Sequence, residues 1–201
     1  EDTSEETAHR AIKFVRSIGK LPVVVKDSPG FLVNRILLPY LIEAVRLFSE
    51  GHSPESIDRA MLDFGMPMGP LRLLDEIGLD VAAHVALDLE RRLAKFSVPR
   101  ILQDIVKTGK LGKKSGQGFY IYRRGKSIGP STAFNKFQSN PKSNNPHSPA
   151  ERMIASMTSE AKKCMDEKIA SSPSDIDFAM VMGTGWAPFR GGPITYSNNQ
   201  T

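Results

Sequence analysis

The sequence predicts an all-α protein built from two copies of one helical unit, and three observations support this prediction. Apolar residues recur at helical spacing along most of the 201 residues. Ser-Pro pairs precede several of these stretches, and proline is favoured at the first position of a helix. In addition, a set of residues recurs 117 positions later in the chain. Two all-α units that pack against each other are the architecture expected from such a duplication.

The first 26 residues predict one helix and one short strand. Residues 4–18 carry apolar side chains at helical spacing, Thr3 and Glu6 are spaced as a capping box, and Gly19 ends the helix. Residues 21–25 are a β-branched run, which predicts a buried strand. No other strong strand follows until the aromatic segment near residue 119, so this strand is expected to have no partner of its own.

Residues 27–122 predict the first helical unit. Ser28-Pro29 is expected to start a long helix that runs to about Glu50 and is kinked at Pro39. Further helices are predicted over residues 53–63, 71–78, 80–95 and 98–109, and an extended aromatic segment over residues 119–122.

Residues 123–147 predict a flexible linker, because they are rich in Gly, Pro, Ser and Asn and lack apolar periodicity. The second, truncated unit is predicted over residues 148–201. It begins with Ser148-Pro149-Ala150-Glu151, a capping box that starts a helix, and Ser172-Pro173 starts another. Because the chain has no initiator Met, we expect it to be part of a longer protein.

The repeat relates the two units residue by residue. Arg35, Glu43, Ala44 and Glu50 match Arg152, Glu160, Ala161 and Glu167 at an offset of 117, and Pro54, Ile57, Asp58, Ala60 and Met61 match Pro173, Ile176, Asp177, Ala179 and Met180 at an offset of 119. Each copy then ends in a turn rich in Gly and Pro. Self-similarity at a fixed offset is the signature of a duplicated unit.

Composition excludes several classes of protein. The longest apolar stretch, Ile36–Ile42, has seven residues, whereas a membrane span needs about 20, so no transmembrane segment is predicted. The lone Cys164 excludes an internal disulfide. The net charge is +5, but the stretch between Ile105 and Ala150 carries nine Lys and Arg residues and no acidic residue, so the rest of the chain has a net charge of −4. This basic run predicts a solvated linker or a region that attracts the phosphates of a small molecule. No nucleic-acid-binding motif accompanies it, so no nucleic acid partner is expected.

Motifs for common chemistries are absent from the sequence. There is no nucleophile elbow, Walker loop or metal-ligand cluster, so no metal is expected. Gly116-Gln117-Gly118 and Gly183-Thr184-Gly185 each lack the third glycine of a dinucleotide fingerprint. None of the four histidines has an evident carboxylate partner for proton transfer; Asp80, four residues before His84, is at the spacing of a surface pair.

Asn34 is the most informative polar residue of the first unit. Asn is a poor helix former, and this one lies inside an apolar helical pattern shortly after Gly30, which allows close approach to the backbone. A buried structural hydrogen bond and a contact to a ligand are both consistent with this position.

Several motifs in order resemble the C-terminal part of L-3-hydroxyacyl-CoA dehydrogenases. They are Asp-x-Pro-Gly-Phe-x-x-Asn-Arg at residues 27–35, Pro39-Tyr40, Glu43-Ala44, Phe-Gly-Met-Pro-Met-Gly-Pro at 64–70, Leu74-Asp75, Gly78-Leu79-Asp80 and Gly-Lys-Lys-Ser-Gly-Gln-Gly-Phe-Tyr at 112–120. The second unit is similar to the extra C-terminal half of the α subunits of multifunctional fatty-acid oxidation enzymes. In that family the single-function enzymes are expected to lack this half.

The resemblance implies a fold like the C-terminal domain of 6-phosphogluconate dehydrogenase. It also implies that residues 1–26 are the end of an NAD-binding Rossmann domain, whose NAD-binding loop and catalytic His and Glu are not in this chain. Asn34 is then the catalytic residue present, near the 3-oxygen of a 3-hydroxyacyl-CoA. The implied substrate-binding residues are Gly30, Phe31, Val33, Met68, Gly69 and Pro70. NAD is the implied cofactor, held mainly by the Rossmann domain.

The implied function is NAD-dependent oxidation of 3-hydroxyacyl-CoA in fatty-acid β-oxidation by the whole enzyme, with this chain inactive alone. The implied partners are the N-terminal domain and a homo-oligomer or multienzyme complex. The implied location is the cytoplasm in a bacterium, or the mitochondrial matrix or peroxisome in a eukaryote. Two alternatives are a non-catalytic subunit-interaction module and the α domain of another hydroxy-acid dehydrogenase.

Overall fold

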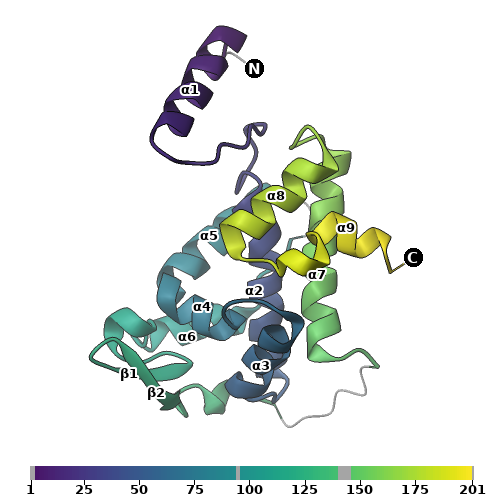
Figure 1. Ribbon diagram of the computed structural model, residues 1–201. Helices are drawn as coiled ribbons and strands as arrows, with labels where there is room; N and C mark the ends of the chain where they lie inside the picture. Colours follow the sequence, from purple (N-terminus) through teal and green to yellow (C-terminus); the bar gives the residue numbers. More distant parts are fainter. Residues whose placement is uncertain (1–2, 94–95, 140–145, 201) are drawn as a thin grey trace.

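The computed structural model describes residues 3–93, 96–139 and 146–200, and within them the chain is mainly helical (Figure 1). The α-helices are α1 (Glu5–Ser17), α2 (Val33–Ser49), α3 (Pro54–Phe64), α4 (Pro70–Ile77), α5 (Leu79–Arg92), α6 (Arg100–Lys107), α7 (Pro149–Asp166), α8 (Pro173–Thr184) and α9 (Pro193–Asn198). Strands β1 (Tyr120–Arg123) and β2 (Lys126–Pro130) form one antiparallel hairpin. The predicted all-α class is confirmed.

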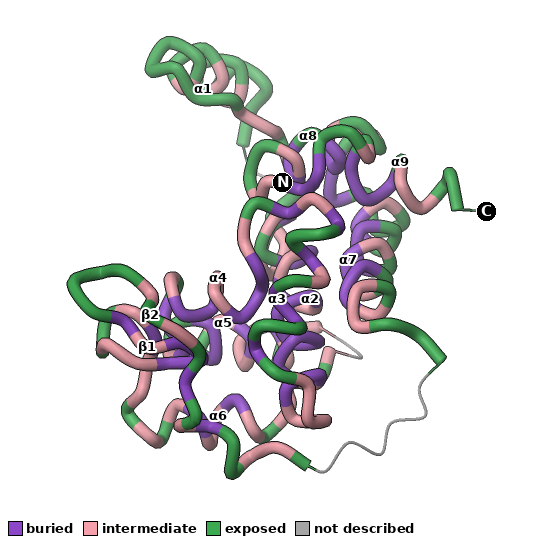
Figure 2. The backbone as a smooth tube through the Cα atoms, turned by 60° about the horizontal axis from the view of Figure 1, so that its bottom comes forward, coloured by how far each residue is buried: buried purple, intermediate pink, exposed green. Residues whose placement is uncertain are grey.

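Helix α2 is the centre of the molecule. The helices of the first unit, α3 to α6, surround one side of it, and α7 to α9 of the second unit cover the other (Figure 1). Its side chains Tyr40, Leu47 and Phe48 are fully buried. Figure 2 shows this buried spine running through the body, whereas α1 is exposed along most of its length. The two units therefore share one hydrophobic core.

The repeat explains how α2 pairs with α7. In α2, the Nε of Arg35 donates to Glu160 of α7 over 3.0 Å, and its two terminal nitrogens donate to Glu167 over 2.6 and 2.7 Å. The hydrogen bond to Glu167 is the largest of the causes that hold the pKa of Arg35 above its ordinary value.

The reverse contact uses the matching residues of the other copy. Arg152 of α7 donates to Glu43 over 2.8 Å and to Glu50 over 2.5 and 2.8 Å, and both glutamates lie on α2. In an interface with two-fold symmetry, every contact occurs twice, with the two copies exchanged. The duplicated units thus pack as a pseudo-symmetric pair within one chain.

A second pair of matched residues caps a helix in each unit. The carboxylate of Asp58 accepts hydrogen bonds from the backbone N–H groups of Leu71 and Arg72, at the start of α4. Gly69 precedes this helix, and a Cβ there would overlap Asp58. The first turn of a helix has N–H groups without intrahelical partners, and a carboxylate satisfies them.

In the second unit Asp177 has the same role. It accepts from the N–H groups of Ile194 and Thr195 at the start of α9, over 2.7 and 3.0 Å. Gly192 leaves the room that this contact needs. The Gly-Pro turn that ends each repeat is therefore a structural device that lets an aspartate cap the next helix.

The N-terminal region differs from the prediction in two ways. The N-cap of α1 is Ser4, whose side chain accepts from the N–H of Thr7, and not Thr3. Residues 21–25 do not form a buried strand: Val25 makes a single antiparallel bridge to Ala170, and Val24 is 55% exposed. A β-branched run forms a strand only where a partner satisfies its backbone groups, and here only its last residue has one.

Helix α2 begins four residues later than its Ser-Pro signal predicts, at Val33 and not at Pro29. Gly30 and Phe31 both have positive φ angles, 75° and 50°, so the chain turns here before the helix starts at Val33. The N–H of Phe31 donates to the carbonyl of Ser28 over 2.7 Å and closes this turn. Asn34 consequently lies in the first turn of α2 and not inside the helix.

The predicted flexible linker is largely structured. Arg124 and Gly125 form the two-residue turn of the β1–β2 hairpin, with positive φ angles of 48° and 75°. Phe134 is buried, 5.2 Å from Phe119 between ring centroids. The segment to residue 139 therefore belongs to the first unit, because two aromatic side chains anchor it. The remainder of the predicted linker includes residues 140–145, which lie outside the described residues.

Candidate functional site

The side chain of Asn34 is exposed at the start of α2 and has no hydrogen bond to another described residue. The alternative of a buried structural hydrogen bond is therefore wrong for this chain. Its neighbour Arg35 points the other way, into the contact with α7, and is 3% exposed. One residue of the Asn-Arg pair thus fixes the helix to the second unit, while the other faces outward and is available to a ligand.

The turn at residues 28–31 is hydrogen-bonded to the first turn of α2 and so fixes the position of Asn34. A terminal nitrogen of Arg35 donates to the hydroxyl of Ser28 over 3.2 Å, and the N–H of Arg35 donates to the carbonyl of Gly30 over 3.3 Å. A Cβ on Gly30 would come within 3.1 Å of the Arg35 nitrogen and 3.2 Å of Leu89. The Pro-Gly-Phe sequence therefore allows the turn to pack tightly under the first turn of α2.

Asn34 lies between two hollows. The first has a volume of about 280 Å³ and is lined by Val23, Val25, Gly30, Phe31, Leu32, Val33, Asn34 and Ala179. The second, of about 270 Å³, lies between α2 and α5 and is lined by Asn34, Leu37, Leu38, Leu41, Ile77, Val81, Ala82 and Val85. Three of the residues implied to bind substrate, Gly30, Phe31 and Val33, thus share the first hollow with Asn34.

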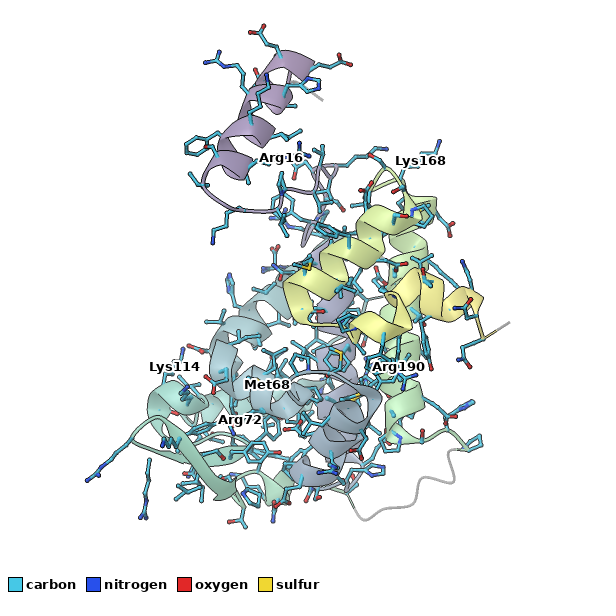
Figure 3. All side chains as sticks on the ribbon, viewed as in Figure 1. Arg16, Met68, Arg72, Lys114, Lys168 and Arg190 are labelled. Atoms are coloured by element: carbon cyan, nitrogen blue, oxygen red, sulfur yellow. The ribbon has the colours of Figure 1, made fainter. Side chains whose placement is uncertain are left out.

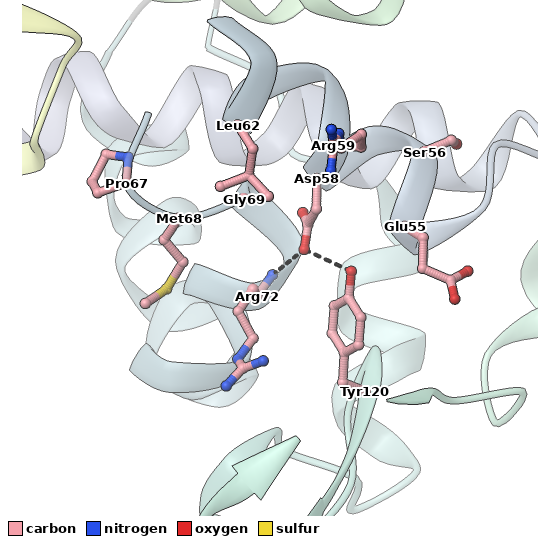
Figure 4. Close-up of a pocket in the computed structure, with 10 residues that line it drawn as sticks. All are labelled: Glu55, Ser56, Asp58, Arg59, Leu62, Pro67, Met68, Gly69, Arg72 and Tyr120. Carbon is pink, nitrogen blue, oxygen red and sulfur yellow. Dashed lines mark hydrogen bonds between the residues drawn. The ribbon is translucent and has the colours of Figure 1, made fainter. Parts of the chain in front are cut away.

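The other three residues implied to bind substrate lie elsewhere in this chain. Met68 and Gly69 line a larger hollow of about 680 Å³ beside Asp58 and Tyr120, and neither residue lines a hollow with Asn34 (Figure 4). Pro70 is buried at the start of α4. Figure 3 shows Met68 in the lower half of the molecule, away from the α1 end.

A carboxylate at the edge of this larger hollow is strongly engaged. Asp58 accepts the hydroxyl of Tyr120 over 2.8 Å, in addition to the N–H groups of α4 that Figure 4 shows in part. Burial raises the pKa of Asp58 to about 6. Because its oxygens already have three donors, Asp58 serves the structure and is not a free acid or base.

The glycine-rich motif at 112–120 surrounds Asp75, which sequence reasoning did not single out. This fully buried carboxylate accepts the N–H groups of Phe119 and Tyr120 and the hydroxyl of Tyr122. A Cβ on Gly118 would overlap it. The glycines therefore make room for a buried carboxylate and not for a phosphate. The Leu-Asp pair in the sequence was the signal available, but only the fold shows what it binds.

Part of the basic run is neutralised within the fold. The ammonium groups of Lys113 and Lys114 donate to Glu76 and Asp80 over 2.8 and 2.7 Å. Asp80 thus pairs with a lysine and not with His84. Over residues 3–93, 96–139 and 146–200 no group of His, Cys, Asp and Glu side chains is arranged to hold a metal ion. No helix in that part of the chain is long and apolar enough to cross a membrane.

Comparison with known proteins decides the family. The model of the 3-hydroxyacyl-CoA dehydrogenase C-terminal domain matches residues 30–122, the segment that contains both Asn34 and the Asp75 motif. This segment belongs to that family. The fatty acid oxidation complex subunit alpha of Shewanella amazonensis is 39% identical over 202 residues, which cover 98% of this chain and 28% of the relative. The chain thus spans about 28% of the length of this relative.

Solved structures extend the likeness to both units. A 3-hydroxybutyryl-CoA dehydrogenase from Escherichia coli aligns over 98% of this chain and 58% of its own, with a TM-score of 0.77 and 25% identity. A (S)-3-hydroxybutyryl-CoA dehydrogenase from Ralstonia eutropha is 40% identical over 61% of this chain and 44% of its own, with a TM-score of 0.58. The Escherichia coli enzyme thus aligns with the second unit as well, whereas the Ralstonia eutropha enzyme aligns with a little more than half of this chain.

Proposed function

We propose that this chain is the C-terminal part of an NAD-dependent L-3-hydroxyacyl-CoA dehydrogenase of fatty-acid β-oxidation. In this proposal a longer polypeptide oxidises the 3-hydroxyl of an acyl-CoA to a ketone, and the present helices supply one wall of the substrate cleft. The family match over residues 30–122 and the position of Asn34 support it.

The observation that carries the proposal is the exposed, unpaired side chain of Asn34 at the start of a 17-residue helix. Its amide group can donate a hydrogen bond to the 3-oxygen of the substrate, on which negative charge builds as the hydroxyl proton leaves. The N-terminus of α2, the positive end of its helix dipole, lies at the same place. A fixed donor of this kind lowers the barrier because it needs no reorganisation during the reaction.

The chain's own glycine motifs do not fit NAD. Gly118 is packed against Asp75, and Gly185 is the C-cap of α8, where a Cβ would overlap or closely contact Pro67. Neither motif lies between a strand and a helix, as a dinucleotide fingerprint requires. NAD is therefore assigned to the remainder of the longer polypeptide, together with the proton acceptor. That remainder is also the first partner of this chain, and in a bacterial source the enzyme would act in the cytoplasm.

The test compares two proteins in one assay of NADH formation from NAD and 3-hydroxybutyryl-CoA. The full-length protein that carries this segment should turn over, and the 201-residue chain alone should show neither turnover nor micromolar binding of NAD by calorimetry. A full-length protein that forms no NADH with any 3-hydroxyacyl-CoA contradicts the proposal. Turnover by the chain alone contradicts the division of roles.

A further inference from the structure

We propose that the hollow between α2 and α5 receives the acyl chain of the substrate and so sets the chain-length preference of the enzyme. The inference rests on the proposed function, and it assigns a role to residues outside the motifs. The hollow has a volume of about 270 Å³ and has Asn34 as its one polar lining side chain. Its other walls are aliphatic, which is the surface that an alkyl chain requires.

The connectivity of the substrate explains why two hollows meet at Asn34. Carbon 3 of a 3-hydroxyacyl-CoA carries the hydroxyl, the alkyl chain on one side and the thioester arm on the other. If the 3-oxygen is at Asn34, the two arms must leave in different directions. The residue lines both hollows, so each arm has a hollow to enter.

The chemistry of the two hollows decides which arm enters which. The hollow beside Gly30 is lined by the irregular segment around residues 23–33, whose backbone groups can meet a polar thioester. The hollow between α2 and α5 is lined by helices, whose backbone groups are bonded internally, and so presents aliphatic side chains. The alkyl arm therefore belongs between α2 and α5.

The exposure of the lining residues fits a site that is open to a ligand. Leu38 and Leu41 are buried and form the floor, whereas Ile77 and Val81 at the rim are 39% and 45% exposed. Aliphatic side chains gathered around an open hollow mark a binding surface more often than a chance feature. A water molecule occupies about 30 Å³ in the liquid. A methylene group is of similar size, so the hollow of about 270 Å³ has room for several of them.

The larger hollow beside Met68 is a poorer candidate for the alkyl arm. It includes the charged side chains Glu55, Arg59 and Arg72, and Asn34 does not line it. An alkyl chain bound there would lie in a hollow that Asn34, the residue proposed to contact the 3-oxygen, does not line. The hollow between α2 and α5 is lined by Asn34.

The test narrows the rim in the full-length enzyme and measures kcat/KM for 3-hydroxybutyryl-CoA and 3-hydroxyhexadecanoyl-CoA. Val81→Trp should lower the ratio of long-chain to short-chain kcat/KM by roughly tenfold or more, since blocking a hydrophobic pocket changes discrimination by that order. The matched control is Ile128→Trp on β2, where an exposed aliphatic residue lines neither of the two hollows at Asn34. The control should leave the ratio unchanged.

A second variant guards against misfolding of the first. Val81→Ala widens the rim without adding bulk, and the loss of contact should lower long-chain kcat/KM by a few fold relative to short-chain kcat/KM. An unchanged ratio in a folded Val81→Trp or in Val81→Ala overturns the acyl-chain assignment and leaves the proposed function standing. A wild-type enzyme inactive on both substrates overturns the proposed function and this inference with it.

Discussion

Replacing Arg35 by Met is the most informative perturbation of the fold, because this side chain joins the two repeated units. Arg35 is 3% exposed and its partner Glu160 is 7% exposed. Removing the arginine leaves a buried carboxylate without its main partner, which costs about 3–5 kcal/mol of unfolding free energy. Lys163, 2.8 Å from the other oxygen of Glu160, compensates in part, so we expect a value near the lower end of that range.

The counterpart Arg152→Met should cost less than Arg35→Met. The side chain of Arg152 is 14% exposed and that of Glu43, the counterpart of Glu160, is 11% exposed, so solvent can replace somewhat more of the lost interaction. In the double variant Arg35→Met/Glu160→Leu, the buried charge is gone as well, and part of the stability should return. This order follows from burial alone, since the two arginines occupy matching positions in the repeat.

Urea unfolding followed by circular dichroism measures these differences. The matched control is Arg59→Met, which removes an ion pair with Asp63 that is 74% and 61% exposed, and it should change the unfolding free energy by about 0.5 kcal/mol or less. If Arg35→Met costs no more than this control, the reciprocal arginine–glutamate pairs do not hold the units together.

Two further predictions concern the buried aspartates Asp58 and Asp75. Burial raises the pKa of both Asp58 and Asp75 to about 6, above the ordinary value of 3.8. The folded protein therefore holds these two protons more tightly than the unfolded chain does. This stabilisation is fully present below about pH 4 and is lost as the pH rises through about 6. Asp58→Asn should make the resulting fall of Tm with pH less steep. A difference in Tm between wild type and this variant that does not change between pH 4 and 7 would contradict the assignment. The second prediction is that Gly69→Ala lowers Tm by several degrees, because the added Cβ would overlap Asp58. The control Ser56→Ala, on the exposed side of α3, should change Tm little. Equal effects of the two variants would show that the close approach of Gly69 to Asp58 is not required.

The sequence was sufficient for features that depend on local or repeated patterns. The Ser-Pro signal predicted the starts of α3, α7 and α8, where Ser53, Ser148 and Ser172 are indeed the N-caps. The same signal at Ser28 was misleading, because Gly30 and Phe31 take left-handed conformations that no propensity rule anticipates for a phenylalanine. The offset of 117 likewise matched the residues of the two copies correctly. It did not show that the arginine of each copy contacts the glutamates of the other copy.

The remaining differences have a common physical origin in long-range contacts. Residues 123–139 have linker composition, yet Phe134 and the β1–β2 hairpin fold them onto the first unit. Residues 21–25 have strand composition, yet they find one bridge at Val25. For the site, the motifs located Asn34 and the turn at Gly30. They could not show that Met68 lines a separate hollow, since sequence gives no distance between the two turns.

The most direct test of the central claim is the variant Asn34→Ala in the full-length enzyme, measured by NAD-dependent oxidation of 3-hydroxybutyryl-CoA. Loss of one preorganised donor to a developing oxyanion typically costs about 10²–10³ in rate. Because Asn34 is exposed and unpaired in this chain, Tm should shift by no more than a few degrees. The account predicts this large fall in kcat in a stable protein. A destabilised protein with nearly normal kcat would contradict it.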